Sequence, residues 1–253
     1  MTSLEWTTLL LLFVRFTAVF VLLPFLNRVR VPVLLKTGLA AMTAYLVFSA
    51  TGPLVAELPT HFLSYFLMVA GEVLVGLTIG LFTLFFFSVA TVAGQYLDLQ
   101  TGLTSASLFD PVYGTQVTLF AQFYQYFALV LYLTIDGHHY LLAALARSAE
   151  LVPLGGAVLR PELFPQFTAY FSQMAMLAFQ LAMPVVLVLV FCDLALGLLA
   201  KTVPQLHVFM VGMPLKVGVA LLVVYLIMPY IAQFLQTVFG NMHQNLSVLF
   251  SLF

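Results

Sequence analysis

Three ionisable side chains lie inside apolar stretches of this sequence, namely Arg15, Glu72 and Asp193. A charge at membrane depth costs at least about 2.5 kcal/mol on insertion scales unless it is paired, hydrated or used in a function. Either Glu72 or a buried carbonyl or water could neutralise Arg15, and the sequence leaves both open. These three intramembrane charges are too few and too scattered to specify a proton relay.

A second group of reactive residues is Asp136-Gly137-His138-His139. Imidazole and carboxylate are both zinc ligands. Consecutive side chains of a helix or strand point to different faces, so we expect a helix cap and loop here and no metal site. The single cysteine, Cys192, excludes an internal disulfide. The sequence therefore predicts no metal and no cofactor.

Signatures of enzymes are absent from the chain. No HExxH, GxSxG, GxxxxGKS or GxGxxG pattern occurs. Ser148 follows the two histidines, but nothing nearby would orient a catalytic triad. We predict that the protein is not an enzyme.

The composition indicates that these residues lie on membrane helices. Of 253 residues, 63% are hydrophobic and only 7% are charged, whereas soluble domains have about 25% charged residues. The mean hydropathy is +1.13. A net charge of −1 gives no electrostatic reason to expect nucleic acid as a partner. We predict an all-α integral membrane protein, a single domain over residues 1–253.

About six long apolar helices, some of them broken, account for the chain. The first is expected to be a retained helix, because Glu5 precedes it where a signal peptide would carry basic residues. The expected segments are Trp6–Leu26, Thr37–Ala56, Phe62–Leu97, Val117–Ile135, Leu163–Cys192 with Pro184 inside it, and Val217–Phe239. A polar stop from Gly240 to Asn245 and a short apolar tail would follow.

Small residues mark faces where helices could approach closely. Gly76 and Gly80 follow Glu72 at a spacing of four, and this small-x3-small pattern is typical of tight helix packing in membranes. We assign helix packing to Gly76, Gly80, Gly94 and Gly102.

The stretch from Gly94 to Gly114 interrupts the apolar sequence and contains Asp98 and Asp110. Non-helical backbone persists at membrane depth only when it is buried in protein or lines water. Gly114 permits positive φ, and Pro111 moves the residue before it away from helix. The stretch is therefore either a re-entrant or pore-facing loop or an ordinary exposed connection.

Near the C-terminus, two long segments joined by a short connection suggest an antiparallel hairpin. Its expected turn includes Lys201, Pro204, Gln205, His207, Pro214 and Lys216. In a six-span arrangement one side has five basic residues, against Arg147 and Arg160 on the other, so the positive-inside rule places the turn in the cytoplasm. The five are Arg28, Arg30, Lys36, Lys201 and Lys216.

An ordered set of residues along nearly the whole chain resembles the FliR/SctT family of type III export-apparatus membrane proteins. The motif Asp136-Gly137-His138-His139 is more similar to the flagellar branch than to the virulence branch, SctT. His207 departs from the Asn expected after Pro-Gln-Leu. The other markers are Arg15, Pro24, Pro32, Lys36, Glu72, Gly76, Gly80, Gly94, Gly102, Asp110-Pro111, Ser148, Pro153, Pro184, Asp193, Gly197, Pro204-Gln205, Phe209, Pro214 and Lys216.

The resemblance implies a subunit of the flagellar export gate in the bacterial inner membrane, at the basal body. It implies FliP and FliQ as pore partners, FlhB and FlhA as further partners, and unfolded flagellar proteins as transient cargo. Residues 1–160 would be FliP-like and residues 161–253 a FliQ-like hairpin. The pore would be closed by a loop containing Ser105, Ala106, Ser107, Leu108, Phe109, Asp110, Pro111 and Gly114.

A small-molecule secondary carrier is the alternative from another class, because carriers also have broken helices near the membrane midplane. Carriers usually show two matched interrupted halves. The segments before and after Pro153 do not match each other, which favours the export subunit.

Overall fold

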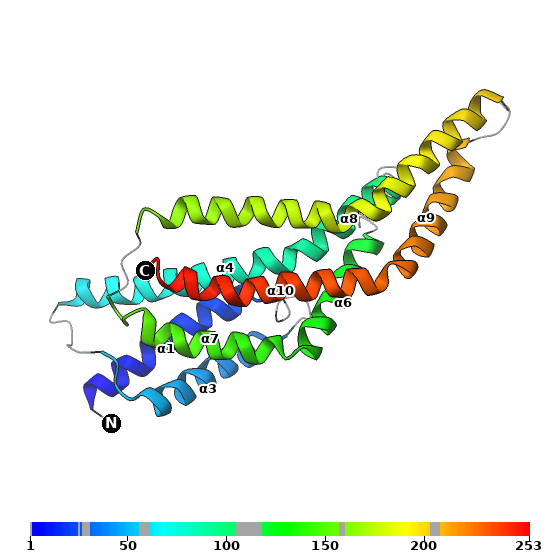
Figure 1. Cartoon of the computed structure of the whole chain (residues 1–253). Coiled ribbons are helices and arrows are strands. Elements are labelled where there is room, and N and C mark those ends of the chain that lie inside the picture. Colours follow the sequence, from blue (N-terminus) through cyan, green and yellow to red (C-terminus); the bar gives the residue numbers. More distant parts are fainter. Residues whose placement is uncertain are drawn as a thin grey trace, which may run out of the picture. The chain divides into compact units, whose positions relative to one another are not determined.

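The computed structural model describes residues 2–24, 26, 31–55, 61–104, 118–156, 160–202 and 208–253, with backbone only for 208–210. The regular elements with assigned bounds in these ranges are all α-helices (Figure 1), which confirms the all-α prediction. They are α1 (Ser3–Leu22), α3 (Val33–Thr51), α4 (Phe62–Thr101), α6 (Leu119–Thr134), α7 (Gly137–Leu151), α8 (Leu163–Thr202), α9 (Val208–Leu226) and α10 (Met228–Phe250).

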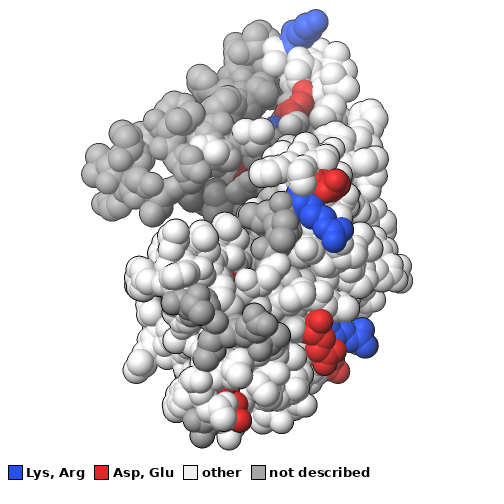
Figure 2. Space-filling view, turned by 90° about the vertical axis from the view of Figure 1, so that its left-hand side faces the viewer, with Lys and Arg blue, Asp and Glu red and all other residues white. Residues whose placement is uncertain are grey.

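The helices have the length and composition of membrane spans. Among the described residues, α1, α3, α4 and α8 are each long and apolar enough to cross a bilayer. The pairs α6–α7 and α9–α10 qualify only when each bent pair is counted as one span, which gives up to six. Figure 2 shows one face on which a few charged side chains are scattered among uncharged ones. The membrane-protein fold class is confirmed.

Several helix ends differ from the expected ones. The helix expected to end at Leu97 continues to Thr101 as α4. The predicted segment Val217–Phe239 is not one continuous helix, because the chain breaks at Ile227, between α9 and α10. Pro229 explains the break, since proline lacks an N–H and its ring clashes with the preceding turn of a continuous helix.

The predicted polar stop at residues 240–245 is also wrong, because α10 continues to Phe250. The polar residues there occupy one side of an amphipathic helix. Its other side is buried at a spacing of three to four residues, with Phe239, Met242, Leu246, Leu249 and Phe250 in the core.

The chain forms two compact units, and α4, α8 and α10 contribute to both. The first contains residues 1–86, 136–171 and 239–253. Within it, α1 is the central helix, because Leu11, Leu12, Phe16 and Val19 are fully buried. Helix α3 lies along α1.

The second unit contains residues 87–135 and 172–238. Aromatic contacts join its helices. Phe87 of α4 packs edge-on against Tyr132 of α6, with ring centroids 4.8 Å apart, and Tyr96 of α4 meets Phe179 of α8 at 5.9 Å. Helices α8 and α9 form a hairpin (Figure 1) in which Gly212 lies against Leu196.

Candidate functional site

The charged centre of the first unit is a buried cluster around Arg15. Its Nε donates to Glu72 Oε2 at 2.5 Å, and both side chains are fully buried. Its terminal nitrogens donate to the backbone carbonyls of Ser148, at 2.7 Å, and Val152, at 3.1 Å. The two neutralising partners left open by the sequence, an acid and carbonyls, therefore act together.

Glu72 completes the cluster from the other side. Its second oxygen, Oε1, accepts a hydrogen bond from the Gly155 N–H at 2.8 Å. Gly155 has a φ of +74°, in the left-handed region that glycine occupies without strain. A single ion pair thus binds α1, α4, the end of α7 and the turn that follows it. A charge pair inside a protein is tolerated when its remaining donors and acceptors are satisfied in this way.

The small-residue face next to the cluster packs against α1 of the same chain. A Cβ on Gly76 would lie 2.3 Å from the carbonyl oxygen of Arg15, and one on Gly80 would lie 2.9 Å from the Cβ of Leu22. Only glycine permits this approach, which brings Glu72, one turn earlier, up to the guanidinium. The sequence predicted close packing here but did not identify α1 as the neighbour.

In the second unit, Asp98 binds the start of α6. Its two carboxylate oxygens accept hydrogen bonds from the N–H groups of Phe120, at 2.9 Å, and Ala121, at 3.0 Å. The helix's own N-cap residue, Thr118, makes no side-chain capping bond. Asp98 therefore satisfies donors that the first turn of any helix leaves free, and its negative charge suits that end of the helix dipole.

Close backbone packing reinforces this contact. A Cβ on Gly94, one turn before Asp98, would lie 2.4 Å from the Cα of Ala121. The sequence does not mark Asp98 as a site residue, because the backbone N–H groups that it binds carry no signal of their own. The predicted plug residues 105–111 and 114 lie outside the described residues, between these two fixed points.

Asp193 belongs to a polar contact between three helices of the second unit. It pairs with Lys216 Nζ of α9 at 2.8 Å and accepts from Gln100 Nε2 of α4 at 3.0 Å. The side chain of Asp193 is 44% exposed, so it is less enclosed than Arg15 and Glu72. The ion pair ties α8 to α9 across the hairpin.

The predicted hairpin turn is shorter than expected. Pro214 and Lys216 lie inside α9 and Lys201 lies in the last turn of α8. Pro214 lies in the second turn of α9, where its missing N–H removes one i→i−4 backbone hydrogen bond. Pro204, Gln205 and His207 lie outside the described residues.

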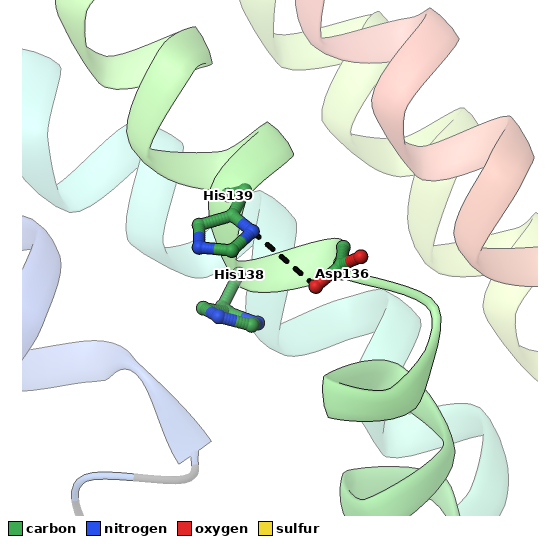
Figure 3. A group of neighbouring side chains, drawn as sticks. All are labelled: Asp136, His138 and His139. Atoms are coloured by element: carbon green, nitrogen blue, oxygen red, sulfur yellow. Dashed lines mark ion pairs between the residues drawn. The ribbon is translucent and has the colours of Figure 1, made fainter.

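The histidine pair lies together, contrary to the expectation that the two side chains diverge. The rings of His138 and His139 are 4.0 Å apart, and Asp136 lies beside them (Figure 3). Both histidines lie in the first turn of α7, which begins at Gly137 immediately after Asp136, the N-cap residue with left-handed backbone.

The comparison with known sequences adds to this geometry. The sequence model of the bacterial export proteins, family 1, matches residues 6–242. The chain belongs to this family. Flagellar biosynthetic protein FliR of Bacillus subtilis (strain 168) is 36% identical, over 91% of this chain and 90% of that protein.

Two further relatives also match most of the chain. Flagellar biosynthetic protein FliR of Escherichia coli (strain K12) is 30% identical, over 99% of this chain and 97% of that protein. Surface presentation of antigens protein SpaR of Salmonella typhimurium is 33% identical, over 85% of this chain and 80% of that protein. The family resemblance inferred from the sequence is thereby confirmed.

Proposed function

We propose that this chain is a membrane subunit of the flagellar type III export gate, through which unfolded flagellar proteins leave the cytoplasm. The observation that carries the proposal is the similarity to FliR of Bacillus subtilis over nine tenths of both chains. The two FliR relatives match more of this chain, 91% and 99%, than SpaR, which matches 85%, and this favours the flagellar over the virulence system. The role is structural, in forming and closing a passage, and needs no chemical step.

Within this function, FliP and FliQ are the proposed partners in the pore, with FlhB and FlhA beside it in the inner membrane at the basal body. The exposed apolar surface supports the proposal that lipid and other subunits cover this protein. Many of its large hydrophobic side chains are half exposed or more, among them Phe66, Phe191, Leu198 and Tyr225. Exposed apolar side chains in such number mark membrane or protein contacts.

The stretch that contains the predicted plug residues 105–111 and 114 is proposed to close the passage through the export gate. Its two flanks are held together by the hydrogen bonds from Phe120 and Ala121 to Asp98. A loop whose ends are joined can project from the fold without disturbing the helices that bear it. Leu108 and Phe109 supply apolar side chains, and a hydrophobic constriction excludes water and ions.

Deleting Ser105 to Phe109 should leave the complex assembled and make it leaky. The assay is co-expression with the FliP and FliQ subunits, recovery of the complex through a tag on FliP, and membrane conductance or small-solute leakage. We expect normal recovery with increased leakage, because Asp98 and its partners lie outside the deletion. A tight deletion complex would rule out the loop as the closure, and absence of any complex with FliP would overturn the subunit assignment.

A matched control separates loop length from apolar sealing. Replacing residues 105–109 with five alternating serines and glycines keeps the length and removes Leu108 and Phe109. Leakage from this variant would assign the seal to those two side chains. Leakage from the deletion variant but not from this control would assign the seal to the length of the loop.

A further inference from the structure

We propose that Asp136, His138 and His139 form a surface site for a divalent cation of the zinc class. The site is independent of the proposed export role, and all three residues lie in the first compact unit. Each offers one ligand atom, and these atoms lie within 4.8 Å of one another. Figure 3 shows the three side chains grouped at the first turn of α7.

The backbone brings the carboxylate to the imidazoles. Asp136 has a φ of +57°, the left-handed conformation that aspartate tolerates better than most residues. It holds the N-cap position of α7, yet its side chain makes no capping hydrogen bond. The carboxylate is directed instead to His139, with Oδ1 and Nδ1 3.3 Å apart.

These distances are close to what a bound cation requires. Tetrahedral ligands about 2.1 Å from zinc lie about 3.4 Å from one another, and the Asp136–His139 pair is already at 3.3 Å. The widest separation, up to 4.8 Å, needs only a side-chain rotation. Asp136 and His139 are free to make it, because their side chains are 69% and 68% exposed.

His138 provides a second, separate indication. Its Nδ1 is shielded from solvent and has no hydrogen-bond partner among the described residues. A shielded polar atom without a partner is unfavourable in a folded protein. A cation that took this nitrogen as a ligand would supply the missing interaction.

The ligand types select the class of cation. Two imidazoles and one carboxylate suit Zn²⁺, Cu²⁺ and Ni²⁺, whereas Mg²⁺ and Ca²⁺ prefer sets made of oxygen. Three protein ligands leave the fourth tetrahedral position to water. The bound ion would hold Asp136 to the first turn of α7 and so stabilise the start of that helix.

The test is calorimetric titration of the full-length chain, purified through a tag without histidines and freed of metal by a chelator. We expect one saturable zinc site per chain and no binding of Mg²⁺. The double variant His138→Ala/His139→Ala should lose the site, and Asp136→Asn should weaken it at least tenfold. Equal melting temperatures of variants and parent in chelator would show that the variants fold.

His61→Ala is the matched control, because His61 is an exposed histidine outside the cluster. It should bind zinc as the parent does. Zinc binding that survives in the double variant, or no saturable binding by the parent chain, would overturn the proposal. In the second case the group is an Asp136–His139 ion pair with the tilted ring of His138 beside it.

Discussion

At the scale of single residues, Arg15 illustrates how a full charge persists among apolar helices. Its guanidinium nitrogens donate to Glu72 and to two backbone carbonyls, and every partner comes from a different segment than its own. The desolvation cost of such an ion is several kcal/mol and is offset only while the partners remain in place. The cluster therefore stabilises one arrangement of α1, α4 and α7 over others.

Removing one member of this ion pair should be strongly destabilising. Arg15→Met leaves the Glu72 carboxylate buried without its countercharge, at a cost of about 3–5 kcal/mol. The double variant Arg15→Met/Glu72→Gln is electrically neutral and should be more stable than Arg15→Met alone, though less stable than the parent. Thermal unfolding in detergent measures the series.

The control for lost positive charge is Lys201→Met, because Lys201 is exposed. It should unfold at the temperature of the parent. The ion-pair argument fails if Arg15→Met is as stable as this control, or if the two substitutions in the double variant simply add.

The sequence identified these charges but not all of their partners. Arg15, Glu72 and Asp193 stand out because charges are rare in apolar stretches. The carbonyls of Ser148 and Val152 carry no such signal, since every residue has one. Asp98 was passed over because its partners are backbone N–H groups that are free only at the start of α6. Tertiary packing, not residue type, selects these partners.

At the scale of the elements, glycines decide which helices lie close together. Gly76 and Gly80 let α4 approach α1 until a Cβ on Gly76 would overlap the carbonyl of Arg15. The spacing predicted a close approach. It could not predict the partner helix, because every apolar helix of this chain offers a similar surface to a small-residue face.

Gly76→Ala should destabilise the first unit even though alanine is the better helix former. The added methyl would lie 2.3 Å from the Arg15 oxygen, and overpacking of this kind costs about 1–3 kcal/mol. Gly71→Ala on the same helix is the control, because a Cβ there meets no atom within 4 Å in the described chain.

The two alanine variants should therefore change the melting temperature in opposite directions. Gly71→Ala should raise it slightly, since alanine gains about 1 kcal/mol of helix propensity over glycine. Thermal unfolding of the chain without partners is the decisive measurement. If Gly76→Ala matches Gly71→Ala there and fails only in recovery of the complex, the face contacts another subunit and not α1.

Helix ends were the least predictable feature at this scale. Hydropathy shows only where apolar residues lie. Helix α4 nevertheless continues through the polar residues Gln95, Asp98 and Gln100. The side chains of Asp98 and Gln100 find partners in α6 and α8, Asp98 with the N–H of Phe120 and Gln100 with Asp193. A polar stretch at a helix end therefore predicts a boundary only when the side chains face solvent.

At the scale of the whole molecule, the main question is what covers the apolar surface. In the second unit, α8 and α9 expose large hydrophobic side chains on much of their surface, including Phe191, Leu194, Leu198, Leu221, Leu222 and Tyr225. Lipid tails are as apolar as the side chains at a helix–helix interface. Hydropathy therefore predicts that these side chains contact either lipid or another protein, but it does not distinguish the two. The division into a FliP-like part, residues 1–160, and a FliQ-like hairpin, residues 161–253, also remains a prediction.

The last prediction concerns the orientation of the chain, which follows from its basic residues and from no packing contact. The positive-inside rule places the connection between α8 and α9 in the cytoplasm and the region of Arg147 outside it. Single cysteines at Lys201 and Glu150, in a Cys192→Ser background, probe the two sides, because both positions are exposed. A membrane-impermeant maleimide should label position 201 only in inverted vesicles, and position 150 only from the periplasm of intact cells. Crosslinking from position 201 should capture FlhB or FlhA, since an apolar hairpin end in the cytoplasm needs a protein to cover it. Labelling of position 201 from the periplasm alone would invert the orientation, and with it the side on which the hairpin meets those subunits.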